Sequence, residues 1–518
     1  MRSRFDILCL KTLLNCPMIC FMRNQGRQTW RFGHFAFVLI FIVVFIFVCG
    51  MFSGSRLLFF QRTPLCKNCN VILVSLDTLS ANHLPCYGYV RNTAPNLCDF
   101  AQQNVLFSHA YANSTWTLPS EVSIFTGLYP STHGVNFPAD SLKTTTPFLP
   151  QILQEQGYKT IFSMNLHNES LPITKVYNRG IDMYVDEDPS WSQALIAFKT
   201  NIDRGEKTFL YLHTFDVHSP YFIGSAPKMY TTDTIPEIPL DNSLFDTSSP
   251  AYIEYLLKIL TDSVGLSYLE PDTKDAYNNI IFLIRTYRSN PALLATKLQQ
   301  YGPYVHPLST MYNYDNKIDI HNPRHIDYIR ALYDQVIHHM DETRLAELFT
   351  FLKNPEVRNS TIVVITGDHG EEFMEHGYIH HISLYDSNLK IPMIISVPGL
   401  NTSKTVTRPV QSADLMPTLL QLLGISYPHT FQGLSLAPLL LGQSLPDRLI
   451  VADYGAKVLR RNNWKLFVTQ HNDGSYIPYE LYDTDKDPGE KTNVLFAHPD
   501  IARQILNIYK SDASKKLL

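Results

Sequence analysis

Uninterrupted apolar stretches, each ending in polar or charged residues, recur along this chain and predict buried β-strands. They begin at Asn70, Tyr158, Thr208, Ser360 and Ile391. Long runs of Val, Ile, Leu and Phe are typical of parallel strands that are covered on both faces. Ligands of open parallel sheets bind outside the carboxyl ends of the strands. The polar side chains that follow these runs are therefore the first candidates for a functional site.

Helical patterns separate the strands. A hydroxyl residue two places before Pro119 and a glycine at position 127 predict a helix with Thr117 at its N-terminus. Backbone N–H groups and the helix dipole favour an anion at such a position. Threonine is also a common helix cap, so an ordinary cap is the alternative for this segment. Further helical patterns cover residues 147–156, 251–264, 277–287 and a long stretch that opens at Asn322.

The length and composition fit a large globular protein of the α/β class. The chain has 518 residues, 45% of them hydrophobic and 17% charged, which allows several domains. Strands that alternate with helices predict a mostly parallel central sheet with helices on both faces. The formal net charge of −4 gives no electrostatic footprint for nucleic acid, which we do not expect as a partner.

An N-terminal apolar segment predicts a membrane anchor. Residues 35–52 contain no charged side chain and are long enough to cross a bilayer, whereas a buried core helix seldom stays apolar for so long. Basic residues are more numerous before the segment than shortly after it, which predicts a cytoplasmic N-terminus. The segment lies deep in the chain and has no clear cleavage site. We therefore expect everything after residue 55 to lie in a periplasm, a lumen or the extracellular space.

Four cysteines follow the predicted anchor and could form two disulfides in an oxidising compartment. They are Cys66, Cys69, Cys86 and Cys98. Cys66 and Cys69 have the spacing of a redox motif, but they precede a strand rather than open a helix, which favours a structural pair. Sequons, which matter in a eukaryotic host, occur at Asn113, Asn168, Asn359 and Asn401.

Acidic residues and a histidine at strand ends predict a metal site. Asp77 closes the first apolar run, and Asp368 and His369 close the fourth, next to glycines that permit close backbone approach. With the Thr117 hydroxyl they would form an oxygen-rich site with one nitrogen ligand. Such a site suits Ca²⁺, Mg²⁺ or Mn²⁺, and the histidine also admits Zn²⁺. The alternative for Asp77 alone is a loop cap.

Two motifs resemble the sulfatase family of the alkaline phosphatase superfamily. The segment from Thr117 to Gly127 resembles the signature Cys-x-Pro-Ser-Arg-x-x-x-x-Thr-Gly, with Thr117 in place of the cysteine and Glu121 in place of the arginine. In sulfatases the cysteine is oxidised to formylglycine, a modification that a threonine cannot undergo. The triplet Asp368-His369-Gly370 after a strand resembles the metal-ligand pair of the superfamily.

The resemblance implies roles for further residues. The metal ligands that it implies are Asp77, Thr117, Asp368 and His369. The groups that it implies for attack on the substrate, for binding it or for protonating the leaving group are Thr117, His167, His218 and His380. Asp216 lies near His218 and could bind a second metal ion. Asn165 stands where the family has a lysine, so half of the expected positive charge is missing there.

The resemblance runs from Asn70 to about Asn493 and implies a smaller C-terminal subdomain. We therefore predict a cytoplasmic segment at residues 1–34, a transmembrane helix at 35–52 and a tether at 53–69. A catalytic domain follows at 70–425, with an insertion at about 225–320, and the C-terminal subdomain covers 426–518.

The sequence predicts a membrane-anchored, metal-dependent, sulfatase-like hydrolase of sulfuric or phosphoric esters with Thr117 as nucleophile. A formylglycine hydrate expels sulfate by re-forming its aldehyde, whereas a sulfated threonine needs direct attack by water. A phosphorylated threonine can pass its phosphoryl group to water or to an alcohol, which favours phosphate esters. The alternatives are a phosphoryl transferase of the same superfamily and a catalytically silent binding or scaffold protein. The sequence leaves the metal, the anionic ester substrate and the oligomeric state open.

Overall fold

The computed structural model describes most of the chain after the predicted tether. The described residues are 65–165, 176–187, 190–219, 221, 229–231, 250–264, 271–301, 305, 318–400, 403–427, 431–471 and 473–515. They belong to the unit Pro64–Leu518. The predicted transmembrane helix at residues 35–52 and the predicted site residue His167 lie outside them. Within the described ranges, no helix is long and apolar enough to cross a bilayer.

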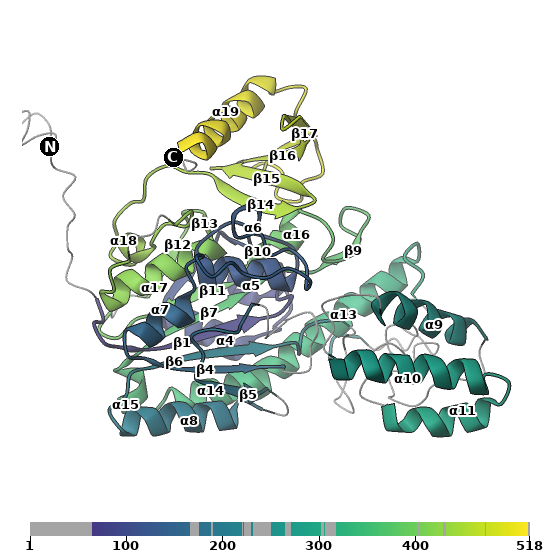
Figure 1. The fold of residues 1–518 in the computed structure, drawn as a ribbon. Coiled ribbons are helices and arrows are strands. Elements are labelled where there is room, and N and C mark those ends of the chain that lie inside the picture. Colours follow the sequence, from purple (N-terminus) through teal and green to yellow (C-terminus); the bar gives the residue numbers. More distant parts are fainter. Residues whose placement is uncertain are drawn as a thin grey trace, which may run out of the picture. The chain divides into compact units, whose positions relative to one another are not determined.

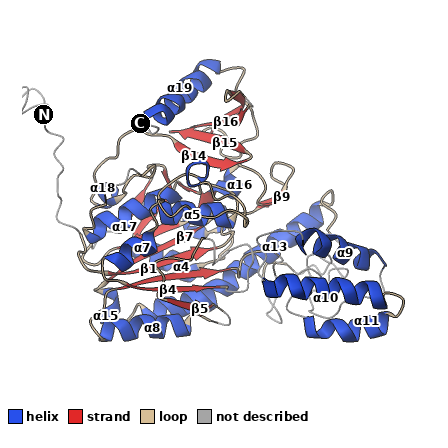
Figure 2. Ribbon diagram, viewed as in Figure 1, coloured by secondary structure: helices blue, strands red, loops and turns tan. Residues whose placement is uncertain are grey.

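An eight-stranded sheet forms the centre of this unit (Figures 1 and 2). In spatial order its strands are β12 (Lys404–Val406), β2 (Val105–Phe107), β11 (Met393–Ser396), β7 (Thr361–Gly367), β1 (Asn70–Leu76), β6 (Thr208–Thr214), β4 (Lys159–Met164) and β5 (Met183–Asp186). Of these eight strands only β11 runs against the others. The structure thus confirms the mostly parallel sheet, and the five predicted apolar runs form β1, β4, β6, β7 and β11.

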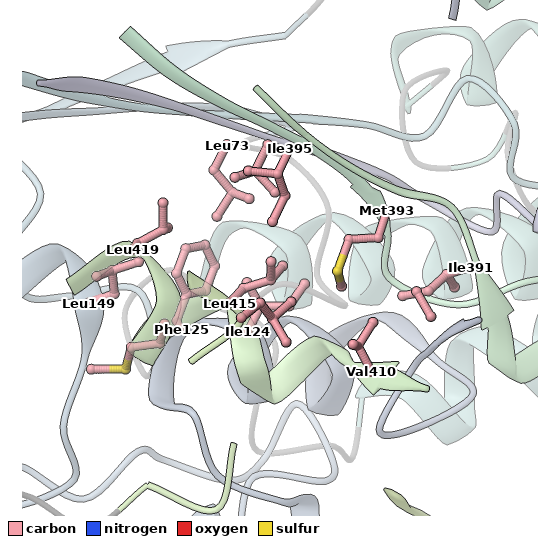
Figure 3. Packing of buried hydrophobic residues seen from close by; sticks show 14 of the residues in the cluster. Leu73, Ile124, Phe125, Leu149, Ile391, Met393, Ile395, Val410, Leu415 and Leu419 are labelled. Carbon is pink, nitrogen blue, oxygen red and sulfur yellow. The ribbon is translucent and has the colours of Figure 1, made fainter. Parts of the chain in front are cut away.

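One face of the sheet packs against three helices that bury their apolar side chains on it. They are α5 (Thr117–Thr126), α7 (Leu149–Glu155) and α17 (Leu415–Leu423). Figure 3 shows Leu73 and Ile395 of the sheet facing Ile124, Phe125 and Leu415 of these helices. Fully burying a side chain such as Phe125 stabilises the fold by about 1.5–3 kcal/mol. This packing fixes α5, and with it Thr117, against the sheet.

The opposite face is covered by the helices α4 (Pro95–Gln103), α8 (Ser192–Asp203), α13 (Pro323–Met340) and α14 (Ala346–Phe351). Side chains alternate between the two faces along each strand. On β1, Val71 and Leu73 lie in the core on the α5 side, whereas Ile72 and Val74 lie in the core on the α13 side. Both faces are therefore buried, which explains the unbroken apolar runs in the sequence.

A further helical group lies between β6 and α13 in the sequence. It consists of α9 (Pro250–Val264), α10 (Pro271–Tyr287) and α11 (Pro291–Leu298), which pack around their own core of Leu256, Leu260, Ile280 and Ile284. The helices predicted at 251–264 and 277–287 are confirmed. This core is separate from the two hydrophobic cores on the faces of the sheet. The three helices therefore form a layer of their own.

The last part of the chain forms a four-stranded antiparallel sheet with one helix. Its elements are β14 (Ile450–Tyr454), β15 (Ala456–Arg461), β16 (Trp464–Gln470), β17 (Tyr476–Asp483) and α19 (Pro499–Lys515). The first strand is joined to the loop before α5, since Asn113 Nδ2 donates to Val451 O at 2.7 Å and Ser114 Oγ donates to Asp453 O at 2.8 Å. The C-terminal sheet therefore stands beside the helix that carries Thr117.

The four cysteines in the described residues form two disulfides. Cys66 pairs with Cys69, and Cys86 pairs with Cys98. The structure thus forms the two bridges that the sequence allows, and the structural role of the first pair stays a prediction.

Candidate active site

Three neighbouring strands, β7, β1 and β6, deliver polar side chains to the sheet face that α5 covers. Ser75 of β1 is in register with His213 of β6 and with Thr366 of β7. His213 lies two residues after Tyr211, which packs in the core on the α5 side, so alternation points both side chains to that face. Asp77 and Asp368 directly follow β1 and β7 at the same edge. The strand ends and the start of α5 therefore meet at one place.

The side chains that meet there are buried and close together. Thr117 Oγ1 donates a hydrogen bond to Asp77 Oδ2 at 3.2 Å. His369 Nε2 lies 3.7 Å from Asp77 Oδ1 and 3.3 Å from Asp368 Oδ2. His213 Nε2 lies 3.7 Å from Asp77 Oδ2. Thr117 is 5% exposed and the other four are fully buried, so this group is shielded from bulk water.

The donor set fits a divalent cation. Asp77, His213 and Asp368 each offer a ligand atom within 4.8 Å of the others. Asp77 Oδ1, Asp368 Oδ2 and the Nε2 atoms of His213 and His369 have no hydrogen-bond partner although they are buried. Buried polar atoms are normally satisfied, and several buried acceptors without a protein partner around one point indicate a cation-binding site. Two carboxylates and two imidazoles suit Zn²⁺ or Mn²⁺ as well as harder ions.

The electrostatics of the protein groups agree with that interpretation. Burial, followed by the charges of Asp368 and Glu121, raises the pKa of Asp77 well above its usual value. Burial and Glu121 likewise raise the pKa of Asp368. Burial lowers the pKa of His213 to about 3 and holds the pKa of His369 well below its usual value, with His381 as the next cause. The imidazoles are therefore neutral, as metal ligands must be, and a cation would let both carboxyl groups ionise.

The glycines and the turn after β1 bring the two acidic loops into contact. A Cβ at position 370 would lie 2.3 Å from Ser387 O, so only glycine fits this approach. Thr78 adopts a left-handed conformation with φ 57°, and its N–H donates to Asp368 Oδ1 at 3.0 Å. Such strain in a β-branched residue is typical of functional sites. The turn thereby fixes the Asp368 carboxylate beside Asp77.

Glu121, which replaces an arginine of the signature, is turned towards β1. It is fully buried, and its Oε1 accepts a hydrogen bond from the Ser75 hydroxyl. Burial raises its pKa to about 7, against the opposing effects of Ser75 and Tyr211. At pH 7 this carboxyl group is therefore about half protonated, which reduces its repulsion for a bound anion.

A second group of imidazoles lies next to the carboxylates. The ring centroids of His381 and His369 are 4.6 Å apart, and those of His381 and His218 are 5.3 Å apart. His381 Nδ1 lies 3.2 Å from Glu371 Oε1. Burial raises the pKa of Glu371, but His381 and its neighbours lower it more, so the net shift is downward. His218 Nδ1 donates to Ser219 O at 2.5 Å and His369 Nδ1 donates to Gly370 O at 3.0 Å, so the Nε2 atoms of these neutral rings are acceptors. The rings thus lie beside the predicted metal ligands.

The structure brings together most of the predicted site residues. Asp77, Thr117, Asp368 and His369 form one cluster, and His218 joins it through His381. His380 is next to this cluster, with its ring centroid 6.5 Å from that of His381, and its backbone has φ 66°. Asp216, in contrast, accepts a hydrogen bond from Arg344 Nε at 2.5 Å. This ion pair competes with the binding of a second metal ion by Asp216.

Sequence reasoning missed His213, Glu371 and His381. His213 carries a signal that could have found it, because it lies at the end of β6, in the strand position where β1 and β7 lead into their acids. His381 was adjacent to the chosen His380, and only the three-dimensional structure distinguishes the two rings.

Comparisons with known proteins agree with the fold. A family model described as Sulfatase matches residues 69–425, and one described as N-sulphoglucosamine sulphohydrolase, C-terminal, matches residues 374–511. Arylsulfatase K of Canis lupus familiaris is 29% identical over 245 residues, which are 42% of this chain and 45% of that protein. The aligned part thus spans less than half the length of that relative.

Two solved structures show the same fold at lower identity. A 2-O GAG sulfatase has 19% identity and a TM-score of 0.58, with coverage of 86% of this chain and 92% of the other. Phosphonate monoester hydrolase of Agrobacterium radiobacter has 17% identity and a TM-score of 0.56, with coverage of 86% and 96%.

A mostly parallel α/β sheet with a hydroxyl, two carboxylates and imidazoles at its strand ends defines the class of sulfatase-like hydrolases. The first family model matches more than half of the chain. The chain belongs to the sulfatase family.

Proposed function

We propose that this chain is a membrane-anchored, metal-dependent hydrolase of an anionic ester and that Thr117 is its nucleophile. The observation that supports this is the 3.2 Å hydrogen bond from Thr117 Oγ1 to Asp77 Oδ2 within a buried group of metal-ligand type. A carboxylate in this position orients the hydroxyl and favours transfer of its proton. Residues 35–52 would hold the catalytic domain on the non-cytoplasmic side of a membrane.

The divalent cation would be held by Asp77, Thr117, Asp368 and His369. His213 is a further ligand candidate. When bound, such an ion lowers the pKa of a hydroxyl and neutralises charge on the attacked group.

The protein's own groups position the ester. Helix geometry leaves the first N–H groups of α5 without intrahelical partners, and the helix dipole makes this end positive. An anionic group bound there lies in line with Thr117 Oγ1. His218 and His380, with His167 from outside the described residues, would contact nonbridging oxygens or protonate the leaving oxygen.

The reaction would proceed in two steps. Thr117 Oγ bonds to phosphorus or sulfur while the ester oxygen leaves with a proton, and water then cleaves the threonine ester and restores the hydroxyl. A phosphorylated threonine is resolved more readily than a sulfated one, which favours phosphoric esters. The similarity to arylsulfatase K and to a 2-O GAG sulfatase favours sulfuric esters. The similarity to a phosphonate monoester hydrolase is consistent with a phosphorus-containing substrate. A transferase would differ only in the acceptor of the second step.

The alternative of a catalytically silent binding protein rests on three departures from the family pattern, which are Thr117 for the cysteine, Glu121 for the arginine and Asn165 for the lysine. Glu121 is the most unfavourable of them for an active enzyme. A charged carboxylate beside the site would repel the substrate, but burial raises the pKa of Glu121 to about 7. Its protonated form is compatible with anion binding, which favours the active enzyme.

The test compares aryl sulfate, aryl phosphate and aryl phosphodiester hydrolysis by the full-length protein, with and without added divalent metals. Thr117→Val removes the hydroxyl but keeps the shape, and it should lower kcat at least about a thousandfold, whereas Thr117→Ser should retain part of the activity. The ester class that responds to both the metal and the valine variant identifies the chemistry. Metal binding without any Thr117-dependent turnover would favour the silent protein instead.

A further inference from the structure

The Asp368 carboxylate has one oxygen bound by the protein and one left for a cation. Its Oδ1 accepts hydrogen bonds from Thr78 N at 3.0 Å and from His369 N at 2.7 Å, whereas the buried Oδ2 has no hydrogen-bond partner among the described residues. The bond from Thr78 depends on the left-handed backbone of that residue, with φ 57°. This conformation is unfavourable for a β-branched residue, so other contacts must hold it.

The hydroxyl group of Tyr333 holds this turn at two points. It donates to Thr78 O at 2.6 Å and accepts from Ser80 N at 2.9 Å. The two backbone atoms belong to consecutive peptide groups, so one side chain fixes the chain on both sides of Leu79. The backbone that presents Thr78 N to Asp368 is therefore held from α13.

Tyr333 reaches the turn from the helix that packs on the sheet face opposite to α5. It is fully buried, and its ring centroid lies 4.9 Å from that of His83, 5.3 Å from that of Tyr221 and 5.1 Å from that of Phe373. Neighbours on several sides leave the ring little freedom to turn. The hydroxyl group is therefore fixed in place by the protein itself.

The next residue of α13, Asp334, anchors the same part of the helix. Its Oδ1 lies 2.6 Å from His83 Nδ1, and its Oδ2 accepts from the side chains of Tyr89 and Arg91 at 2.6 Å each. All three partners follow the turn in the chain, so these bonds join α13 to the segment after β1. They contact no predicted metal ligand, whereas Tyr333 acts one hydrogen bond away from one.

We propose that Tyr333 is a positioning residue of the candidate metal site, because it holds the turn that aims Asp368 Oδ2 at the cation. The proposal rests on the proposed function and adds to it a residue that touches neither the ion nor the ester. Without the hydroxyl group the strained turn relaxes, Thr78 N leaves Asp368 Oδ1, and the carboxylate is free to rotate. Metal affinity therefore falls although every ligand is still present.

Metal affinity tests this role without any turnover. Mn²⁺, Zn²⁺ and Ca²⁺ are titrated separately into the metal-free full-length protein by calorimetry. For the ion that wild type binds most tightly, Tyr333→Phe should raise the Kd about tenfold, because lost support of a metal ligand costs affinity on that order. The matched control is Tyr87→Phe, since the Tyr87 hydroxyl also accepts from a backbone N–H, that of Met393 on β11 at 2.9 Å. This control should keep the wild-type Kd. Equal Kd values for wild type and Tyr333→Phe, or no metal binding by wild type, would overturn the proposal.

A glycine at position 78 shows whether the effect passes through the turn. Glycine adopts the left-handed backbone without strain, so the turn no longer depends on the hydroxyl group. The double variant Thr78→Gly/Tyr333→Phe should therefore fold even where Tyr333→Phe alone does not, and its Kd should lie within about threefold of that of Thr78→Gly. A double variant that also fails to fold, or one that binds about tenfold more weakly than Thr78→Gly, would show that Tyr333 does not act through the turn.

Turnover separates the positioning role from the hydrolase. A raised Kd for Tyr333→Phe, with no ester hydrolysed by wild type, would contradict the hydrolase and leave the positioning role intact. Hydrolysis that depends on Thr117, with the same Kd in wild type and Tyr333→Phe, would contradict the positioning role and leave the hydrolase intact.

Discussion

Glu121 shows how a single residue can change the electrostatics of a site without leaving the fold. It replaces a cation of the sulfatase signature, yet it is buried with the Ser75 hydroxyl as its partner. An ionised carboxylate would be unfavourable there, and burial raises its pKa to about 7. The protein therefore accommodates the acid by making it take up a proton much more readily than a free glutamate does.

Replacing Glu121 by glutamine is expected to stabilise the metal-free protein at alkaline pH. The folded pKa lies above the usual glutamate value of 4.5, so between these two pH values the folded state holds a proton that the unfolded state has lost. The stability that this group contributes is present at low pH and declines as the pH rises from about 4.5 to about 7. Glu121→Gln should therefore unfold at higher urea concentration than wild type at pH 8, by roughly 3 kcal/mol, and at about the same concentration at pH 5.

The control for this prediction is Glu254→Gln on α9, which changes an exposed glutamate. It should shift neither the pH profile nor the unfolding midpoint. If Glu121→Gln and wild type differ equally at pH 5 and pH 8, Glu121 is ionised in the fold and the neutral-acid account fails.

At the scale of elements, apolar patterning alone located the central strands. β1, β6 and β7 are buried on both faces, so their sequences are unbroken apolar runs that stand out clearly. The same property conceals which face each side chain takes, because no polar and apolar alternation marks the faces. For this reason Asp77 and Asp368 could be predicted from their places after strands. His213 had a signal only in its place near the end of β6, and the direction of its side chain needed the structure.

Contacts between segments that lie far apart in the chain could not be predicted from the sequence. The bond between Ser75 and Glu121 depends on how α5 packs on β1, and the contact of His381 with Glu371 depends on the path of the loops after β7. The engagement of Asp216 by Arg344 depends on a helix that follows more than a hundred residues later. Short loops without periodicity carry no signal for such contacts.

A buried ionic group joins the C-terminal sheet to the catalytic part. Arg460 donates to both carboxylate oxygens of Asp386 at 2.5 and 2.6 Å, and Lys465 Nζ lies 2.7 Å from Asp386 Oδ1. Burial raises the pKa of Asp386, but Arg460 and Lys465 lower it more, and the net shift is well below the usual range. Asp386 stands on α16 (Asp386–Leu389), so this contact ties two elements that lie far apart in sequence.

Replacing Asp386 by asparagine is expected to destabilise the protein by about 3–5 kcal/mol, because the buried Arg460 loses its carboxylate partner and Lys465 keeps only Glu490. A carboxylate with a lowered pKa contributes stability above its unfolded pKa of about 4 and loses it as the pH falls towards the folded value. The difference in Tm between wild type and Asp386→Asn should therefore be constant above about pH 4 and narrow below it. The exposed Asp485 gives the matched control, Asp485→Asn. Equal Tm values for both variants would show that the ionic group adds nothing to stability.

At the scale of the whole molecule, the predicted membrane orientation and the disulfides support one another. Disulfides persist in oxidising compartments, and both described bridges lie after the predicted anchor. The orientation itself stays a prediction, because residues 35–52 lie outside the described residues.

Glycosylation of Asn359 tests that orientation. Asn359 is exposed directly after α15 (Pro355–Arg358), whereas Asn113 is fully buried and its Nδ2 donates to Gln411 Oε1 and to Val451 O. A glycan on Asn113 would displace both bonds, so the folded protein can carry one at position 359 but not at 113. Expressed in a eukaryotic cell, the full chain should lose one endoglycosidase-sensitive glycan in Asn359→Gln. Asn359→Asp, which also destroys the sequon, should behave in the same way, whereas Asn354→Gln, outside any sequon, should keep wild-type mobility. An unglycosylated wild-type chain would place the catalytic domain in the cytoplasm and reverse the predicted topology.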